Sequence, residues 1–304
     1  KAVNKQYKLK IANELKEFQF TNLADLLLIS HPENSNVYID KYGCVQTATA
    51  QQSPVSAVSL NHFDCAGILE KKDDKFFLFN DYDSRTSVNL VILTFENKQG
   101  SDKGKLIINA KNSVWSDYVF GKFTELFGTY YTKYYEKQKH ISAEKQIKQS
   151  LDQDIPLSVY LETEQGWQFV DFFPVVGPLA TRDLVMAIDL TKAKSKNVRI
   201  KLVTGFMFWE MGYAAMDFTD NLTVRTTLLK PSSAIDEKGN DMLSALYNDD
   251  DLRLEQLSVG NEVIVKYDVP QFDNNIKDDN IQTICLHSKG YSEKIMDYPF
   301  KPDW

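Results

Sequence analysis

The sequence predicts a mainly β protein, a β-sandwich with a helical insertion, flanked by two related β-rich units. One observation is a series of short segments, rich in β-branched residues, at fairly regular intervals, which is typical of sandwiches. Another is a block between these segments in which apolar residues recur at helical spacing. The third is an internal repeat on either side of the central region. At 304 residues, the chain is long enough for two or three domains.

The repeat aligns residues 54–74 with residues 231–251 without a gap. Each copy begins Pro-x-Ser-Ala, and seven of the 21 aligned positions are identical. A proline and an alanine at a fixed offset suit one backbone path, so we expect two equivalent loop-and-strand units. The identical pairs are Pro54/Pro231, Ser56/Ser233, Ala57/Ala234, Asp64/Asp241, Leu69/Leu246, Asp73/Asp250 and Asp74/Asp251.

The repeat suggests a division into three consecutive segments. Residues 1–97 form an N-terminal β-rich unit with the first copy, and residues 221–304 form a C-terminal β-rich unit with the second. Residues 98–220 between them form the central sandwich, which contains the helical insertion at 114–151.

In the N-terminal segment, residues 21–28 predict a short helix with Thr21 as its cap. His31 precedes a proline, which disfavours helical backbone and ends the helix there. Asn36–Ile39 predicts a strand, and the β-branched run at 88–95 predicts a buried one.

The central segment begins with a strand at 106–110, and its character then changes. Apolar residues from 114 to 138 recur in steps of one, three and four, which predicts one face of a helix. Gly121 and Gly128 weaken a straight helix, since each costs about 1 kcal/mol relative to alanine. Ser142 is placed to cap a second helix that runs to about residue 151. The periodic residues are Trp115, Tyr118, Val119, Phe123, Leu126, Phe127, Tyr130 and Tyr134.

Strand patterns return after the helices, separated by polar turns. Two further strands are expected near the C-terminal end, after the second repeat copy. The expected strands are 157–162, 167–172, 184–190, 198–204, 206–218, 263–269 and 281–287.

Composition limits the partners that the protein can have. The net charge of −7 argues against nucleic acid, which requires basic residues to neutralise its phosphates. No run approaches about 18 apolar residues, so no transmembrane segment is expected. Glycan and protein ligands remain as the expected partners.

The sequence predicts no cofactor. There is no Cys-x-x-Cys pattern, which disfavours structural zinc. Cys44 and Cys65 are able to form a disulfide, or all three cysteines, with Cys285, are reduced and pack as small hydrophobic residues. Three acidic clusters have the oxygen ligands that calcium prefers, although solvated turn residues explain them better. These clusters are Asp73-Asp74, Asp81 with Asp83, and Asp249-Asp250-Asp251.

No catalytic residue is assigned. Two carboxylate pairs near aromatic strands have the residue types that glycoside hydrolysis uses, Glu162 with Glu164 and Glu210 with Asp217. The odd spacing of the second pair predicts opposite faces of one strand. His62 lies three residues before Cys65, but neighbours in sequence do not by themselves form a catalytic dyad.

Aromatic residues are the better candidates for ligand contacts. Trp167 directly follows a turn, and Trp209 lies in an aromatic-rich strand, so either can stack on a sugar or belong to the core. Tyr130, Tyr131 and Tyr134 offer a second aromatic surface, or else they close a helix onto a sheet.

Two short segments carry a resemblance to known proteins. Residues 197–218, NVRIKLVTGFMFWEMGYAAMDF, resemble the closing hairpin of galactose-binding-like β-sandwiches. The segment CLHSKGYSEKI, at 285–295, resembles the ending of uncharacterised secreted proteins and lipoproteins of Bacteroidetes-like bacteria. The resemblance implies a jelly-roll or galactose-binding-like sandwich, a secreted or cell-envelope location, and a carbohydrate-binding or adhesive role.

The expected function is therefore a binding module for carbohydrate or protein. A carbohydrate-active hydrolase and a structural component of a surface assembly are the alternatives. A concave pocket with two convergent carboxylates would favour the hydrolase, whereas a shallow aromatic face would favour binding.

Overall fold

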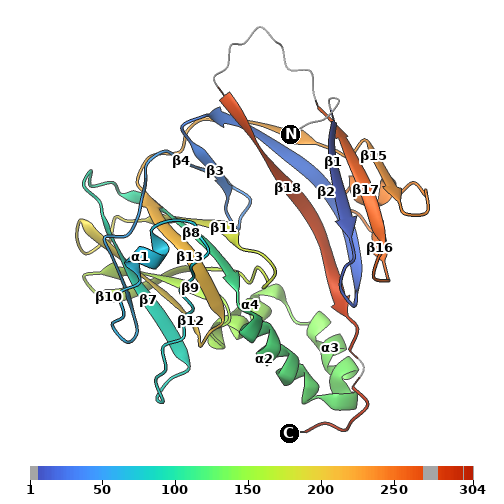
Figure 1. The fold of residues 1–304 in the computed structure, drawn as a ribbon, viewed down its shortest axis with the longest axis horizontal. Coiled ribbons are helices and arrows are strands. Elements are labelled where there is room, and N and C mark those ends of the chain that lie inside the picture. Colours follow the sequence, from blue (N-terminus) through green and yellow to red (C-terminus); the bar gives the residue numbers. More distant parts are fainter. Residues whose placement is uncertain (1–5, 270–279, 297, 304) are drawn as a thin grey trace. The chain divides into compact units, whose positions relative to one another are not determined.

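The computed structural model describes residues 6–269, 280–296 and 298–303. The protein is mainly β, and its antiparallel sheets pack together as a β-sandwich, as predicted (Figure 1). It divides into two compact units, one within Lys1–Asn34 and Leu222–Asp297 and the other within Ser35–Asn221 and Tyr298–Trp304. This division differs from the three consecutive segments, because strands far apart in the sequence pair with one another.

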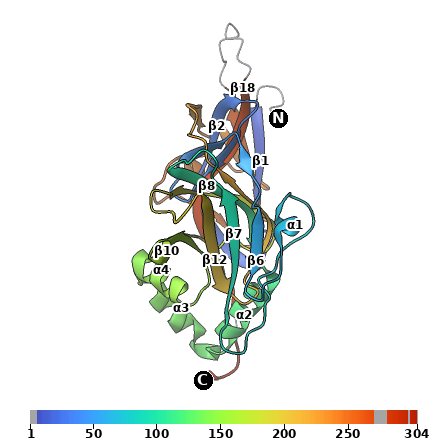
Figure 2. The same ribbon diagram turned by 90° about the vertical axis from the view of Figure 1, so that its left-hand side faces the viewer.

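The unit built on residues 35–221 contains two sheets. One has the strand order β10-β9-β12-β7-β6, of which β6, β7 and β12 are seen side by side in Figure 2, and the other has the order β11-β8-β13-β5. Buried residues from both sheets form one core, in which the residues of β7 alternate between buried and half-buried positions. The strands are β5 (Gln51–Gln52), β6 (Ser56–Ser59), β7 (Val88–Glu96), β8 (Lys103–Asn112), β9 (Leu157–Thr163), β10 (Gly166–Phe173), β11 (Arg182–Asp189), β12 (Asn197–Gly205) and β13 (Trp209–Asp217).

A small hairpin covers part of the second sheet. Strands β3 (Asn36–Ile39) and β4 (Val45–Ala48) pair with each other, and Tyr38 and Ala48 pack against Ile107 of β8. The outer side of that sheet is therefore partly buried as well.

Helices interrupt the strands between β8 and β9. The helix expected over 114–138 is broken at Gly128, whose φ is +47° and whose missing side chain leaves room for the backbone of Phe300. Ser142 caps the next helix as predicted, accepting a hydrogen bond from the backbone N–H of Lys145. The elements are α2 (Val114–Glu125), the 3-10 turn η1 (Gly128–Tyr130), α3 (Tyr131–Lys139) and α4 (Ala143–Asp152).

The apolar spacing of α2 does not produce a buried face, because Thr124 is its only buried residue. Trp115, Tyr118 and Phe123 are all exposed.

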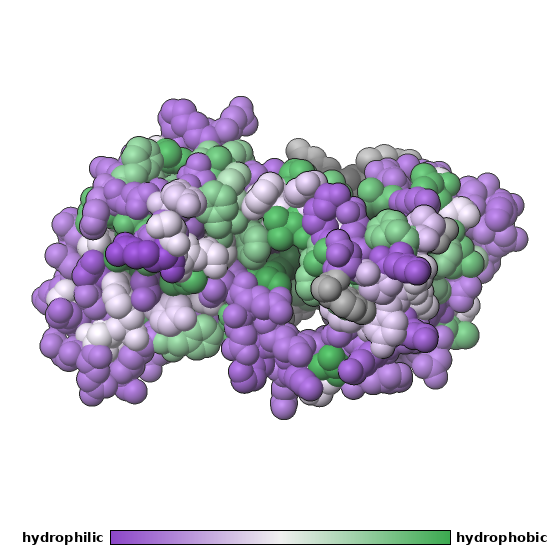
Figure 3. All heavy atoms as spheres, turned by 90° about the horizontal axis from the view of Figure 1, so that it is seen from below, coloured by the Kyte–Doolittle hydropathy of each residue, from purple (hydrophilic) through white to green (hydrophobic). Residues whose placement is uncertain are grey.

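On the face shown in Figure 3, hydrophilic residues cover the larger part of the surface, with smaller apolar areas between them. No helix in the described ranges is long and apolar enough to span a membrane.

The unit that contains the N-terminal strands also has two sheets. Strand order is β1-β17-β15 in one sheet and β14-β2-β16 in the other, where β18 also pairs with β2. Leu26, Leu28, Val263, Val265 and Tyr267 are among the residues of its core. The strands are β1 (Gln6–Ala12), β2 (Glu17–Pro32), β14 (Arg225–Leu229), β15 (Ser233–Asp236), β16 (Leu254–Gln256), β17 (Glu262–Asp268) and β18 (Asn280–Lys294).

The helix predicted at 21–28 is wrong, because these residues lie within β2. This strand pairs with β14, β16 and β18. Ladder hydrogen bonds to three strands, together with burial of Leu26 and Leu28, outweigh the local helical preference.

The two repeat copies have the same local structure. Each consists of a strand, a tight turn and a one-turn helix, α1 (Ala66–Leu69) or α5 (Ser244–Tyr247). Cys65 N–H donates to the carbonyl of Ala57 at 2.9 Å, and Met242 N–H donates to that of Ala234 at 2.8 Å. These donors and acceptors occupy equivalent positions in the aligned copies, which confirms that the two copies follow one backbone path.

The turn residues agree in the same way. His62 and Gly239, at equivalent positions, both have positive φ, +64° and +88° respectively. Asp64 and Asp241 each accept a hydrogen bond from the backbone N–H two residues later. The repeat therefore preserves a turn geometry even where glycine has been replaced by histidine.

The correspondence extends to strands outside the repeat. Leu93 of β7 pairs with Ala57 on one side and Ile200 of β12 on the other. Val265 of β17 pairs with Ala234 on one side and Leu9 of β1 on the other. The hairpin β1–β2 is thus the counterpart of β12–β13.

A β-bulge occurs at nearly the same place in the second strand of both hairpins. In β2 the register skips Asn22, between Thr21 and Leu23, and in β13 it skips Gly212. Counting from the equivalent residues Leu9 and Ile200, the two bulges lie 13 and 12 residues further on. A bulge is a specific feature of a strand, so its recurrence supports a common plan for the two units.

Each hairpin precedes one repeat copy in the sequence but pairs with the other. Hairpin β1–β2 comes before β5 and β6, yet β1 pairs with β17 and β2 pairs with β14. Hairpin β12–β13 comes before β14 and β15, yet β12 pairs with β7 and β13 pairs with β5. The chain therefore contains two copies of one strand plan whose hairpins are exchanged between them.

This exchange predicts which fragments fold. Residues 35–221 contain both hairpin β12–β13 and its partner strands, so this fragment is expected to unfold cooperatively in urea. The fragment 1–97 separates β7 from β12 and β1 from β17, and we expect no cooperative transition for it. Circular dichroism during urea titration tests both, and cooperative folding of 1–97 would contradict the exchange.

Candidate functional site

Trp167 lies on the outer face of the five-stranded sheet. On β10 it pairs with Glu162 of β9, and Phe169 pairs with Tyr160. The residues on either side of Tyr160 in β9, Val159 and Leu161, belong to the core. Because side chains alternate along a strand, Trp167, Phe169 and Tyr160 share the side that faces away from the core.

Two cations of β12 approach these rings. The ammonium of Lys201 lies 4.8 Å from the ring centre of Tyr160 and 4.9 Å from that of Trp167. The guanidinium carbon of Arg199 lies 5.5 Å from the Trp167 ring centre. The rings of Tyr160 and Phe169 meet edge to face at 5.5 Å. We call Tyr160, Trp167, Phe169, Arg199 and Lys201 the aromatic-cation face.

The two cations differ in their partners. Arg199 Nη1 donates to Glu162 Oε1 at 2.7 Å. Lys201 has no ion pair or hydrogen bond with any residue that the structure describes, and its ammonium lies over the rings of Tyr160 and Trp167. Burial lowers the pKa of Lys201, since a partly desolvated ammonium is less stable as a cation. An ion pair with an incoming anion would stabilise the charged ammonium and so offset the cost of its desolvation.

The tyrosines predicted as a second ligand surface have different environments. Tyr131 is buried, and its ring contacts those of Tyr134, Tyr135 and Tyr298. Tyr134 stacks on Phe127 with ring centres 4.0 Å apart. These contacts form the small core of the helices, and of the three predicted residues Tyr130 is the exposed one, at 46%.

Trp209, also predicted as a ligand contact, belongs to the core. Its side chain is completely buried, and the indole N–H donates to the carbonyl of Ile155 at 2.9 Å. A residue without exposed surface has no face to offer a ligand, so Trp209 is corrected from a binding residue to a packing residue.

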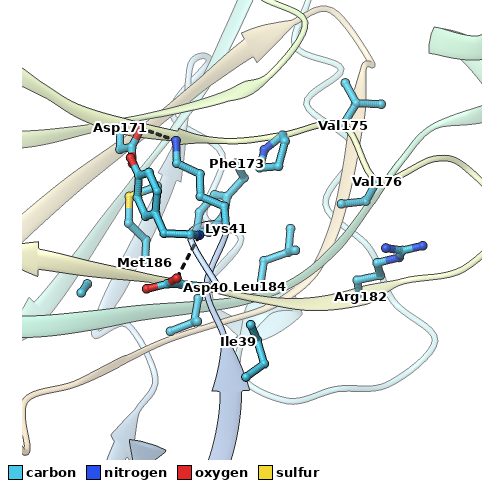
Figure 4. Close-up of a pocket in the computed structure, with 14 residues that line it drawn as sticks. Ile39, Asp40, Lys41, Asp171, Phe173, Val175, Val176, Arg182, Leu184 and Met186 are labelled. Atoms are coloured by element: carbon cyan, nitrogen blue, oxygen red, sulfur yellow. Dashed lines mark hydrogen bonds and ion pairs between the residues drawn. The ribbon is translucent and has the colours of Figure 1, made fainter. Parts of the chain in front are cut away.

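A pocket of about 270 Å³ lies between the edge strands of the two sheets (Figure 4). Strands β10 and β11 each end their sheet, and the turn after β3 contributes a third wall. Its lining is mostly apolar, and Arg182 stands at one side, away from Asp171 and Lys41. The lining includes Ile39, Phe173, Val175, Val176, Leu184 and Met186.

The two carboxylates of this pocket are occupied by internal partners. Asp171 pairs with Lys41 and accepts a hydrogen bond from the Tyr42 hydroxyl at 2.8 Å. Asp40 accepts from the backbone N–H groups of Tyr42 and Cys44, at 3.0 and 2.9 Å, and from a Gln46 amide. Both carboxylates therefore hold the turn after β3 in place. Because each already accepts hydrogen bonds from the protein, the two do not form a free general acid and general base in the cavity.

The carboxylate pairs predicted from the sequence are also engaged. Glu162 binds Arg199, and Glu210 lies 3.3 Å from Lys111. The prediction that Glu210 and Asp217 lie on opposite faces is wrong, because the bulge at Gly212 changes the alternation between them. They pair with Lys111 and Lys105, which are an even number of residues apart on β8. Glu164 is an exposed turn residue.

The remaining chemical candidates have structural roles. Cys65 is fully buried, and burial raises its pKa to about 12, so the thiol is not poised as a nucleophile beside His62. Cys44, Cys65 and Cys285 are all free. Of the acidic clusters, Asp83 pairs with Arg85 and Asp249 with Lys289. Within the described residues, no group of three or more potential metal ligands converges.

Trp167 was predicted as a ligand contact from the sequence, but its neighbours on the sheet were not. Tyr160, Phe169, Arg199 and Lys201 come from three strands, and only the β9–β10 and β9–β12 pairings bring them together. The one local signal was the alternation of basic and apolar residues in the segment Val-Arg-Ile-Lys-Leu at 198–202.

The aromatic-cation face combines exposed aromatic surface with a cation that has no acidic partner among the described residues. In the pocket, by contrast, both carboxylates have internal partners, and most of the tyrosine cluster packs on other rings. Comparison of the chain with protein-family models, curated proteins and solved structures gives no match.

Proposed function

We propose that the protein is a binding module that recognises a glycan through the aromatic-cation face. The observation that carries the proposal is the position of Trp167 on an outer sheet face, with the half-exposed ring of Phe169 beside it and with Lys201, which has no acidic partner among the described residues. Sugars present C–H groups on one face of the ring and hydroxyl groups at its edge. An indole with polar neighbours suits both.

The expected affinity is modest. One sugar or base stacked on an aromatic side chain contributes about 1–3 kcal/mol. A single platform therefore needs additional polar contacts, and we expect dissociation constants in the micromolar to millimolar range. Weak binding of this kind suits a surface that engages a repeating polymer at several places.

The resemblance to galactose-binding-like sandwiches supports the same proposal, and with it we propose a location outside the cell or in its envelope. A protein ligand is the alternative occupant of the face, and a purely structural role is the alternative for the whole chain. The hydrolase hypothesis has weaker support, because the carboxylates near the pocket and the sheet face have internal partners.

Replacing Trp167 with alanine is expected to weaken glycan binding by about tenfold or more, because the stacking contact is lost. The melting temperature should change little, since the residue lies outside the buried core. A glycan array on the purified protein would select the oligosaccharide, and titration calorimetry would compare the two proteins.

The matched control is Phe120→Ala, which removes an exposed aromatic ring from α2, a helix that contributes no residue to the aromatic-cation face. It should leave glycan binding unchanged. Equal weakening by both variants, or glycan turnover abolished by Asp171→Asn, would contradict the proposed function.

A further inference from the structure

The duplicated strand plan supplies an internal comparison for Lys201. Lys201 on β12 pairs in register with Ile92 of β7, and Lys10 on β1 pairs in the same way with Ile264 of β17. The two lysines therefore occupy equivalent positions on the outer faces of equivalent sheets.

Their electrostatic environments are different. Lys10 Nζ lies 3.0 Å from Glu262 Oε2, and the hydrogen bond and charge of Glu262 raise the pKa of Lys10. Glu262 pairs with Ala12, whose counterpart Val203 pairs with Leu90. The position that holds a carboxylate in one unit thus holds a leucine in the other, and Lys201 loses its partner.

Within the described residues, the aromatic rings come from strands that one unit has and the other lacks. The sheet with Lys10 ends at β1, whereas the sheet with Lys201 continues beyond β12 into β9 and β10. Tyr160 and Trp167 lie on these additional strands and hold the ammonium between their rings. Aromatic faces stabilise a cation but leave it able to pair with an anion.

We propose that the ligand of the aromatic-cation face is an anionic saccharide, whose carboxylate or sulfate pairs with Lys201 while its sugar ring contacts Trp167. This inference rests on the proposed function and specifies its substrate class. A charged group would take the place that Glu262 fills beside Lys10. Arg199 donates a hydrogen bond from Nη1 to Glu162, and its other N–H groups bond to no residue that the structure describes. Arg199 can therefore supply a second contact to the anionic group of the saccharide.

A short or sparsely charged anionic saccharide fits this face better than a nucleic acid. The chain carries a net charge of −7, so a long polyanion would meet repulsion outside a site with two cations, whereas a short acidic oligosaccharide extends little beyond that site. An acidic protein segment would also pair with Lys201, but it offers no sugar ring to Trp167.

Titration calorimetry with three oligosaccharides tests the proposal. The probes are a galacturonic acid tetramer, the same tetramer as its methyl ester, and a sulfated galactose tetramer. The acid is expected to bind about tenfold more tightly than its ester, which has the same rings without charge. Raising the salt concentration from about 0.05 M to about 0.5 M should remove most of that preference. Comparison of the acid with the sulfated tetramer identifies which anion the site takes.

Three variants separate the contributions. Lys201→Met should abolish the preference for the acid and leave binding of the ester, whereas Lys201→Arg should retain it. Lys10→Met changes the equivalent lysine, whose charge already has a partner, and should have no effect. Trp167→Ala should weaken binding of acid and ester alike.

The outcomes distinguish this inference from the proposed function. If the ester binds as tightly as the acid and Trp167→Ala weakens both, the face binds neutral glycan and the inference is overturned. If Lys201→Met leaves the acid preference intact, it is overturned as well. If a glutamate-rich peptide binds in a Lys201-dependent manner and no tetramer does, both proposals are overturned.

Discussion

Replacing Trp209 with alanine is expected to lower the free energy of unfolding by about 3–5 kcal/mol. The side chain is completely buried in the core that both sheets of its unit share. Truncation would leave a cavity, and interiors packed as densely as organic crystals cannot close such a space without cost. The carbonyl of Ile155 would also lose the indole N–H that it accepts at 2.9 Å.

Urea unfolding monitored by circular dichroism measures this loss. Trp167→Ala is the matched control, since it removes the same side chain from the outer face of the sheet. The two variants should separate stability from binding: one lowers the unfolding midpoint, and the other lowers glycan affinity. A small loss of stability for Trp209→Ala would show that the core near β13 can repack.

Local sequence patterns predict an element correctly where the tertiary contacts of that element agree with its intrinsic preference for helix or strand. The run at 88–95 is a strand whose residues alternate between the core and the outer face, as its β-branched composition predicts. Ser142 caps α4 because a serine at that position can accept the hydrogen bond of Lys145. Sequence alone could supply these results.

Contacts between distant strands could not be predicted in this way. Nothing within residues 21–28 reveals that β2 will receive three partner strands. The exchange of hairpins likewise depends on pairings such as Leu9 with Val265, which lie more than 250 residues apart. The aligned repeat indicated two related units, but which hairpin completes each unit is a property of the folded chain.

The candidate site shows the same limit. The aromatic character of Trp167 and its place after a turn were visible in the sequence, and its exposure depends on the alternation along β10. The absence of an acidic partner for Lys201 among the described residues stands out against its counterpart Lys10, which pairs with Glu262, and neither environment can be read from the sequence. A bulge of one residue at Gly212 was enough to reverse the predicted faces of Glu210 and Asp217.

Replacing Lys105 with methionine should produce the second large effect, a loss of about 3–5 kcal/mol in the free energy of unfolding. Lys105 Nζ lies 3.4 Å from Asp217 Oδ1, and both side chains are almost fully excluded from solvent. Removing the cation leaves a buried carboxylate whose remaining support is hydrogen bonding from Ala50 and Thr219. The double variant Lys105→Met/Asp217→Asn removes both charges, so it should lose less stability than Lys105→Met alone.

The pH dependence of this loss tests the electrostatic cause. Burial of Asp217 opposes ionisation, but hydrogen bonds from Thr219 and Ala50 and the charge of Lys105 outweigh it, so the pKa of Asp217 is lowered. A lowered pKa contributes stability above the unfolded value of about 3.9, and this contribution disappears as the pH falls through the folded value. The difference between the wild type and Lys105→Met should therefore be full at neutral pH and shrink below about pH 4. A deficit that stays constant down to acid pH would mean that Lys105 stabilises the protein through the packing of its alkyl chain, because packing does not titrate.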